Sequence, residues 1–459
     1  MQPPIVGNYR PGGVDIFFLG ITMVIGGQYI IWNEGLKDGV YGYAIACLLM
    51  GAAYVVFCCC IAEITGALPF AGGSYGLTRC TLGLYMGFLI GCCEALEYIV
   101  YVSSAVVSLG QIVTECVPDL EGYEPLIWLA FYVTALFFHI RGFRPFWVLN
   151  FLLGMVSLLI VLIFCFGSLS HINFNKYALK ADIARSDKSG GVVGFMSVMP
   201  LAAWFFLGIE TLNLASDQVE RPTVVIPKAQ ICCVLTLFVT GAMVFFVAIS
   251  LPPGISSYPQ EFAALNRGFV LMFPLTKASA TLLSLPATYA TAFAFIWCYG
   301  KLISAMATSK LLPPVLAARS RYGTPYVAIV TGSVISYVAS AVVFYTDHSN
   351  FAAITCITCA FLTYIAQCIS YISLRLNLRN METSTFRSPF GIAGAVFAIG
   401  VWVLALVGVA GFQENHYIVV STLVIIIALL SVFYLVYARK RQTLSPQEKR
   451  VLLVARDLV

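Results

Sequence analysis

Charged residues are scarce in this chain of 459 residues: Asp, Glu, Lys and Arg make up 10% of it, against 60% hydrophobic residues. Such a balance cannot cover the surface of a soluble protein of this length. The sequence has only four histidines, no zinc-type Cys/His spacing and no Gly-Lys-Ser/Thr phosphate loop. These absences argue against a metal site, a Ser/His/Asp enzyme and ATP hydrolysis. We therefore expect neither enzymatic activity nor a cofactor.

The apolar residues are gathered into runs of roughly 20, the length of helix that crosses a bilayer. About twelve runs can be placed, at residues 14–36, 41–67, 78–112, 125–140, 145–168, 192–216, 228–251, 278–308, 325–345, 351–374, 391–411 and 417–438. They predict an all-α polytopic membrane protein. Because the loops are short, we expect one transmembrane domain over 14–438, between terminal segments 1–13 and 439–459.

The net charge of +5 does not indicate nucleic-acid binding, because the Lys and Arg residues form no basic stripe. Most of them fall in the loops on one side, namely Arg10, Arg79, Arg141, Arg144, Arg221, Lys228, Lys310, Arg319, Arg321, Arg375, Arg379, Arg387, Arg439, Lys440, Arg441, Lys449 and Arg450. Positive loops stay in the cytoplasm. The distribution predicts that both termini are cytoplasmic. We expect a multi-pass integral membrane protein of the plasma membrane.

Two glycine-marked interruptions stand out, Ile25-Gly26-Gly27-Gln28 in the first run and Leu207-Gly208-Ile209-Glu210 in the sixth. Unwound backbone persists in lipid only where its freed N–H and C=O groups line a cavity or hold a ligand. Paired breaks of this kind are typical of transporters with a binding site near the bilayer midplane.

The breaks lie about five spans apart, as expected for two five-helix halves of inverted topology. We place the first repeat at about 14–168, the second at about 192–374, and two extra helices at about 391–438. The halves share no clear residue identity, so this prediction depends on break position and span count alone.

Fourteen of the fifteen cysteines fall in apolar runs or at their cytoplasmic ends, where they act as small buried residues. Cys116 is predicted to lie in an outer loop with no second outer cysteine. It is either a half-buried free thiol or the site of a disulfide to a partner chain.

The third run contains four polar or aromatic residues on one helical face, namely Glu94, Glu97, Tyr98 and Tyr101. A carboxylate at the membrane centre costs about 2.5 to 3.5 kcal/mol, so this face is expected to point into the bundle. Two carboxylates flanked by tyrosines suit a substrate ammonium group. Alternatively, both glutamates bond to polar groups of neighbouring helices.

The sixth run reads Trp204-Phe205-Phe206-Leu207-Gly208-Ile209-Glu210. Aromatic residues before a break can close over a ligand, or they can be ordinary core. Glu210, directly after the break, is a candidate proton carrier, with Glu63 the next candidate. Lys301 lies well within the eighth run and needs an internal carboxylate or a water-filled vestibule, unless it reaches the cytoplasmic interface.

Several segments resemble the amino acid, polyamine and organocation transporter superfamily, and within it most closely the ethanolamine permeases. The resemblance covers nearly the whole chain and is carried by Val24-Ile25-Gly26-Gly27-Gln28-Tyr29, Trp32-Asn33-Glu34-Gly35-Leu36, Ala62-Glu63, residues 68–76, Glu94 with Glu97-Tyr98, residues 204–210, Glu220-Arg221-Pro222, Ile226-Pro227-Lys228, Leu312-Pro313-Pro314 and Gly323-Thr324-Pro325.

The resemblance implies a five-plus-five inverted-repeat bundle with two extra helices that works by alternating access. It implies that residues 25–28 and 205–208 are unwound and face the substrate. Trp204 corresponds to a gating aromatic residue, and Phe295 to an aromatic residue lining the same pocket. Glu210 corresponds to the acidic residue linked to proton coupling, and Lys301 to a basic position of the subgroup.

Two residues depart from that pattern. Gln28 stands where ethanolamine permeases often have an acidic residue, and residues 145–168 contain no lysine to take the place of a sodium ion. The coupling ion, H⁺ or Na⁺, therefore stays open, as does exchange without net ion coupling.

We expect a secondary transporter of small amines or amino acids. Two alternatives are a subunit linked through Cys116 to a partner glycoprotein and a receptor that binds nutrients without transporting them.

Overall fold

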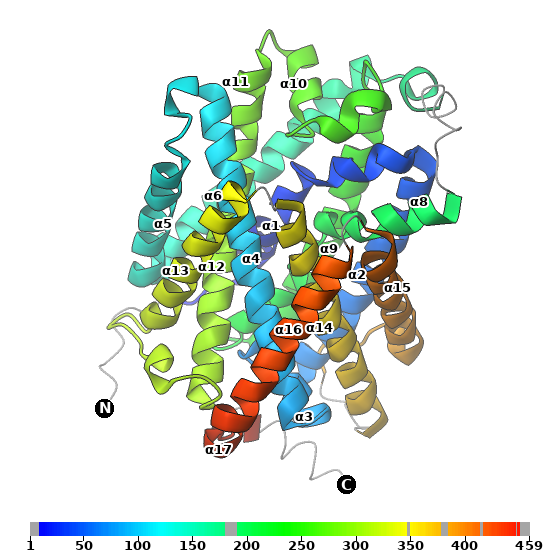
Figure 1. Cartoon of the computed structure of the whole chain (residues 1–459). Helices are drawn as coiled ribbons and strands as arrows, with labels where there is room; N and C mark the ends of the chain where they lie inside the picture. The colour runs from blue at the N-terminus through cyan, green and yellow to red at the C-terminus, as the bar shows by residue number, and fades with distance from the viewer. Residues whose placement is uncertain are drawn as a thin grey trace.

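The computed structural model describes residues 9–179, 191–346, 349–377, 384–413, 416–446 and 448–449. Most of the predicted terminal segments 1–13 and 439–459 lies outside these ranges. Within them the chain is helical, and the only β pairing is a bridge between Ile30 and Ala263. Figure 1 shows the helices as one bundle. Residues 9–11 and 445–446 lie at the same face of it, since they line two cavities that share Asp217, Lys301 and Arg319. We call this the termini face.

The helices of the bundle are α1 (Gly13–Val24), α2 (Val40–Ala67), α3 (Gly73–Thr81), α4 (Leu84–Cys116), α5 (Glu124–Arg141), α6 (Phe143–Gly167), α8 (Gly191–Val198), α9 (Pro222–Ile249), α10 (Asn266–Met272), α11 (Lys277–Thr281), α12 (Leu285–Thr308), α13 (Tyr326–Tyr345), α14 (Ser349–Asn377), α15 (Gly391–Phe412), α16 (His416–Phe433) and α17 (Arg439–Arg441). Four 3₁₀ segments matter for the site: η1 (Ile25–Gln28), η2 (Trp32–Asp38), η7 (Met199–Phe205) and η8 (Ile209–Ala215).

Ten helical stretches of the described chain are long and apolar enough to cross a membrane. The two remaining predicted spans correspond to α1 with η1 and η2, which is interrupted, and to α5, which has Glu124 at one end and Arg141 at the other. The prediction of an all-α polytopic membrane protein is confirmed.

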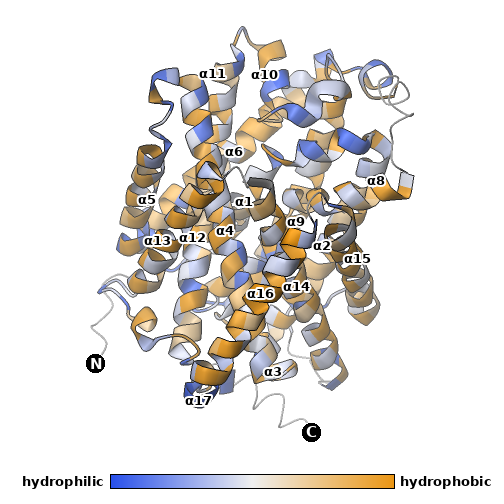
Figure 2. Cartoon of the chain, viewed as in Figure 1, coloured by the Kyte–Doolittle hydropathy of each residue, from blue (hydrophilic) through white to orange (hydrophobic). Residues whose placement is uncertain are grey.

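The outer surface of the bundle is apolar. Figure 2 shows hydrophobic residues along the middle of the helices and hydrophilic ones gathered toward the two ends. On α16, Val424, Ile425, Leu429 and Val432 are all more than half exposed. Side chains of this kind fit lipid rather than water, so α16 lies at the rim of the bundle.

The centre of the bundle is formed by α4, which packs against α12, α14 and α3, and by α1, which packs against α9 and α6. Between these two groups lie the interruptions of the first and sixth predicted spans. The fold therefore brings residues far apart in sequence to one buried place.

Candidate substrate-binding site

The first interruption begins where α1 ends at Val24. η1 is a tight 3₁₀ turn rather than fully unwound backbone, and the chain changes direction at Ile31, which has a φ of 77°. The N–H of Gly26 donates to Thr291 Oγ1 at 3.1 Å, and that hydroxyl donates to the carbonyl of Thr22 at 2.9 Å. A side chain of α12 thus satisfies backbone groups that the break has freed.

The second interruption lies between η7 and η8, in Phe206-Leu207-Gly208. Gly208 has a φ of 102°, and a Cβ there would lie 2.5 Å from the Phe295 ring. Only glycine combines this backbone conformation with so close a neighbour. The predicted break is therefore present, and its glycine is required by both conformation and packing.

The two interruptions touch each other. A Cβ on Gly27 would lie 1.8 Å from the carbonyl oxygen of Trp204, far closer than any real contact. The absence of a side chain at Gly27 therefore lets the first break lie against the backbone that precedes the second.

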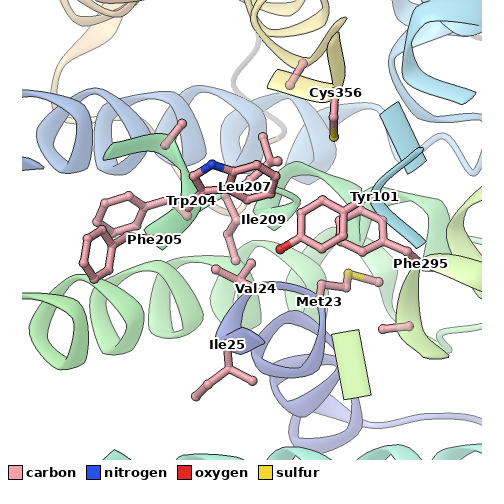
Figure 3. Close-up of a cluster of buried hydrophobic side chains, with 14 of the residues drawn as sticks. Met23, Val24, Ile25, Tyr101, Trp204, Phe205, Leu207, Ile209, Phe295 and Cys356 are labelled. Carbon is pink, nitrogen blue, oxygen red and sulfur yellow. The ribbon is translucent and has the colours of Figure 1, made fainter. Parts of the chain in front are cut away.

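Aromatic rings cover this contact. The ring of Tyr101 stacks on Phe295 with centroids 4.4 Å apart and lies 5.4 Å from the ring of Trp204. Tyr98 lies one turn before Tyr101 on α4, and its ring centroid is 5.4 Å from that of Phe295. In Figure 3 Trp204, Tyr101 and Phe295 gather above α1. The structure thus brings together the predicted gating tryptophan and three of the predicted pocket aromatics.

A small cavity of about 20 Å³ lies against this group, lined by Gly26, Gly27, Ile30, Ile31, Tyr101, Ser104, Ala105, Ser108, Trp204, Thr288 and Thr291. It holds no more than about one water molecule. Two larger cavities, of about 360 and 290 Å³, open near the termini face. In this conformation the centre is therefore closed to a ligand of amino acid size, and the free space lies on the termini side.

Glu94 is buried and satisfied. It accepts bonds from the Ser74 hydroxyl at 2.5 Å, the Ser74 N–H at 3.2 Å and the Tyr98 hydroxyl at 2.7 Å. These contacts hold the start of α3 against α4. They agree with the alternative in which Glu94 bonds to its neighbours, so a substrate would have to compete with three existing donors.

Glu97 and Glu210 differ from Glu94 because their oxygens lack good partners. Glu97 is fully buried, receives one long bond from the Tyr364 hydroxyl at 3.4 Å, and leaves Oε2 unpaired. Glu210 is 1% exposed, and neither of its oxygens has a hydrogen bond of ordinary geometry among the described residues. Potential donors beside it are the Tyr364 hydroxyl and the N–H of Gly208.

These carboxyl groups form one cluster, since Glu210 lies close enough to Glu94 and Glu97 for their charges to interact. We call Glu94, Glu97 and Glu210 the carboxyl cluster. Three unpaired carboxyl oxygens in one buried place cannot all carry charge without a proton or a cation beside them. The cluster can therefore hold an ammonium group, protons, or both.

Lys301 has an internal carboxylate partner that the sequence did not reveal. Its Nζ lies 2.5 Å from Asp217 Oδ1, and both residues line the two cavities near the termini face. Of the alternatives considered for Lys301, the structure has both the internal carboxylate and a vestibule. Asp217 lies just beyond η8, so the ion pair links the second interrupted span to α12.

Glu63 lies away from the carboxyl cluster. Its side chain bonds to Arg375 Nη1 at 2.7 Å, to the Tyr371 hydroxyl at 2.7 Å and to the Ser388 N–H at 2.9 Å. Tyr54 of α2 lies beside Glu210 and Glu97. Glu63 is nine residues beyond Tyr54, about 13 Å along the helix. This ion pair ties α2 to α14 and gives Glu63 a structural role in this conformation.

Four predicted pocket residues point elsewhere. Gln28 is turned toward α9, where Nε2 donates to the carbonyl of Leu237 at 3.1 Å and to Thr240 Oγ1 at 3.0 Å. Phe205 packs on Trp32 with centroids 5.0 Å apart, Phe206 packs on Tyr54 at 5.2 Å, and Ile25 points away from Trp204 in Figure 3. The expectation that these side chains line the pocket is wrong for this conformation, because the 3₁₀ turns rotate them into the core.

Cys116 is half-buried at the end of α4, with its thiol 3.0 Å from the carbonyl oxygen of Ala278.

Two facing helix interruptions above a buried carboxyl cluster are the architecture of a secondary transporter. The family model described as amino acid permease matches residues 19–449. The chain therefore belongs to the amino acid permease family, which confirms the predicted superfamily and the prediction that the chain is not an enzyme.

Relatives of known name agree with this assignment. The chain is 23% identical to the methylthioribose transporter of Bacillus subtilis (strain 168), with 94% of each chain covered. It is 23% identical to the gamma-aminobutyric acid permease of Escherichia coli (strain K12), over 79% of this chain and 80% of that one. It is 24% identical to the amino-acid permease GAP5 of Candida albicans, over 85% of this chain and 66% of that one.

The chain is thus an amino acid permease of the membrane, with a small molecule as its expected cargo. These relatives do not single out the ethanolamine subgroup, and they give no support to a disulfide-linked partner chain.

Proposed function

We propose that this permease moves small zwitterionic amino acids and ethanolamine-like amines across the plasma membrane by alternating access. The observation that carries the proposal is the carboxyl cluster, whose Glu97 and Glu210 leave three buried oxygens without a good partner. An amine cargo supplies the missing positive charge and the missing donors at once.

The other end of the cargo lies at the first interruption. Gly26 and Gly27 line the small cavity and present backbone to it, which suits either a carboxylate or a hydroxyl. Gln28 is hydrogen-bonded to α9. Discrimination between a carboxylate and a hydroxyl on the cargo is therefore assigned to the backbone and to Thr291 and Ser104. Ser104 is a good candidate, since its Oγ is buried without a partner.

Trp204 and Tyr101 separate the small cavity from the carboxyl cluster along α4 and act as the gate. Their rings have the area needed to cover an amine and attract its charge. The empty space near the termini face then serves as the exit, on the cytoplasmic side.

Coupling to protons is assigned to Glu210. A buried carboxyl group without a counter-charge is more stable in its neutral form, and an arriving ammonium group favours the charged form. Binding of the cargo would thus displace a proton from Glu210. Lys301 contributes through its ion pair with Asp217, which links the second interrupted span to α12.

The test is a competition uptake screen with the purified protein in vesicles. Labelled ethanolamine and a labelled small amino acid are each offered alone and with unlabelled amines, amino acids, dicarboxylates and sugars. We expect ethanolamine and zwitterionic amino acids to compete with each other and dicarboxylates and sugars to have no effect. Binding without uptake would instead identify a receptor, and sodium-stimulated uptake without pH dependence would exclude proton coupling.

A further inference from the structure

The C-terminal segment folds back over the termini face after α17. Its residues Gln442 and Thr443 contact α3 and the end of α12. The N–H of Thr443 donates to the carbonyl of Ser309 at 3.0 Å, and Arg79 Nη2 donates to Gln442 Oε1 at 3.2 Å. Figure 1 places α3 and α17 at this same end of the bundle.

Glu448 anchors the segment. It is fully buried, and its carboxylate pairs with the Arg79 guanidinium, whose side chain is 1% exposed. It also accepts bonds from the Ser309 hydroxyl at 2.6 Å and from the N–H of Ser445 at 2.6 Å. Further hydrogen bonds support this buried ion pair, from Ser309 and Ser445 to Glu448 and from Arg79 Nη2 to Gln442. The Arg79–Glu448 ion pair is therefore a buried, hydrogen-bonded contact and not an exposed charge pair.

The segment is shaped locally for this contact. The hydroxyl of Ser445 accepts the N–H of Glu448 at 3.2 Å, while the Glu448 side chain accepts the N–H of Ser445. This reciprocal pair is a capping box, which fixes the turn and aims Glu448 at Arg79.

The C-terminal segment also forms part of the wall of one cavity near the termini face. Ser445 and Pro446 line the 290 Å³ cavity together with Asp217, Lys301 and Arg319. The C-terminal segment therefore lies over the ion pair that links the second interrupted span to α12, and it joins α3 to the end of α12 across the cavity.

We propose that the described residues 443–446 and 448–449 are a latch that restrains opening of the transporter at the termini face. The proposal rests on the transport function above. Release of cargo on this side requires the cavity beside Asp217 and Lys301 to widen, and Glu448 holds together two of the elements that border it. Undocking of Glu448 from Arg79 frees the exit.

Truncation after Gln442 tests the latch in vesicles. We expect the shortened permease to take up cargo at least about three times faster at the same membrane level, because exit is no longer restrained. A peptide with the sequence of residues 443–449, added on the termini side, should return the rate toward that of the full chain. The matched peptide with Glu448→Gln should have no effect. Equal rates before and after truncation overturn the proposal, as does equal inhibition by the two peptides.

Cys80 gives a readout that does not depend on transport, because its thiol lies 3.9 Å from the backbone carbonyl of Glu448. Truncation should raise the rate at which a maleimide labels Cys80 at least about threefold, with Cys80→Ser as the control. Glu448→Gln leaves Arg79 buried without a counter-charge, so the exchanged pair Arg79→Glu with Glu448→Arg is used beside it. That exchange should restore slow labelling.

The two proposals fail differently. Uptake that is absent in every variant refutes the transport function, and the latch with it. Uptake that persists unchanged while Cys80 labelling rises refutes the latch alone.

Discussion

At the scale of single residues, the site is defined by what its carboxyl groups lack. Glu94 has three donors from Ser74 and Tyr98, whereas Glu97 and Glu210 have buried oxygens without good partners. The three glutamates of the cluster thus divide into one that is bonded to its neighbours and two with buried oxygens that lack donors. The sequence placed Glu94 and Glu97 on one helical face, but it could not distinguish them, because Ser74 comes from α3 and Tyr364 from α14.

Glu97→Gln tests recognition of the amine. Removal of a buried charge partner costs about 2 to 5 kcal/mol, so the half-saturating concentration should rise at least about 30-fold. Surface expression should stay near that of the wild type, because no described residue forms an ion pair with Glu97. Glu94→Gln is the matched control, which should instead weaken the contact with Ser74 and lower expression. Unchanged half-saturation in Glu97→Gln would assign that residue a structural role.

Glu210→Gln tests proton coupling. If the cargo displaces a proton from Glu210, wild-type uptake should fall as external pH falls, because external protons then compete with the ammonium group of the cargo for the Glu210 carboxylate. A glutamine cannot titrate, so the variant should show a flat response over the same pH range. The measurement is initial uptake rate against external pH at fixed internal pH. A full pH response in the variant would place the proton carrier elsewhere.

At the scale of elements, the two interruptions were predictable and their side chains were not. The Gly26-Gly27 pair, the single Gly208 and the apolar length on either side mark residues 25–28 and 207–210 as breaks. The direction of each side chain depends on the kind of turn, and η1 and η7 are 3₁₀ segments that rotate Gln28 and Phe205 into the core. Asp217, the partner of Lys301, and Tyr364, the partner of Glu97, come from distant parts of the chain. No local sequence pattern predicts such contacts.

Gly27→Ala tests the contact between the two breaks. A Cβ there would meet the Trp204 carbonyl at 1.8 Å, so the first break must shift. Overpacking of this kind costs about 1 to 3 kcal/mol or more, and both thermal stability and uptake should fall. Gly400→Ala is the matched control, because a Cβ on that residue of α15 meets nothing within 4 Å. Equal behaviour of the two variants would show that the breaks do not depend on this contact.

Gln28→Glu tests the corrected position of that side chain. The carboxylate would lose the donor that Gln28 offers to the carbonyl of Leu237 and would face that oxygen as a like partial charge. We expect lower stability with little change in the ratio of ethanolamine to amino acid uptake. A strong shift of that ratio toward ethanolamine would show that Gln28 turns to the cargo in another conformation of the cycle.

At the scale of the whole molecule, alternating access needs two bodies that move against each other and contacts that hold each state. The small central cavity is closed to a cargo of amino acid size, the larger cavities lie toward the termini face, and the ion pair of Asp217 with Lys301 lines the larger cavities. The arrangement fits a state in which the exit has begun to form but has not opened. Composition and break position predicted the bundle, whereas this state could come only from the packing of the helices.

The Asp217–Lys301 pair yields the last prediction. Loss of one member leaves a buried charge alone, which costs about 3 to 5 kcal/mol, whereas loss of both leaves neutral side chains that pack. Asp217→Asn and Lys301→Met should therefore each lower the folded yield sharply, and the double variant should recover most of it. If the pair also restrains opening, the recovered double variant should bind cargo normally but turn over at a different rate, since the contact between the second interrupted span and α12 is lost. Yield in detergent, equilibrium binding and initial uptake rate measure the three effects separately. A double variant with wild-type yield and wild-type turnover would reduce the pair to a stabilising contact and remove it from the transport cycle.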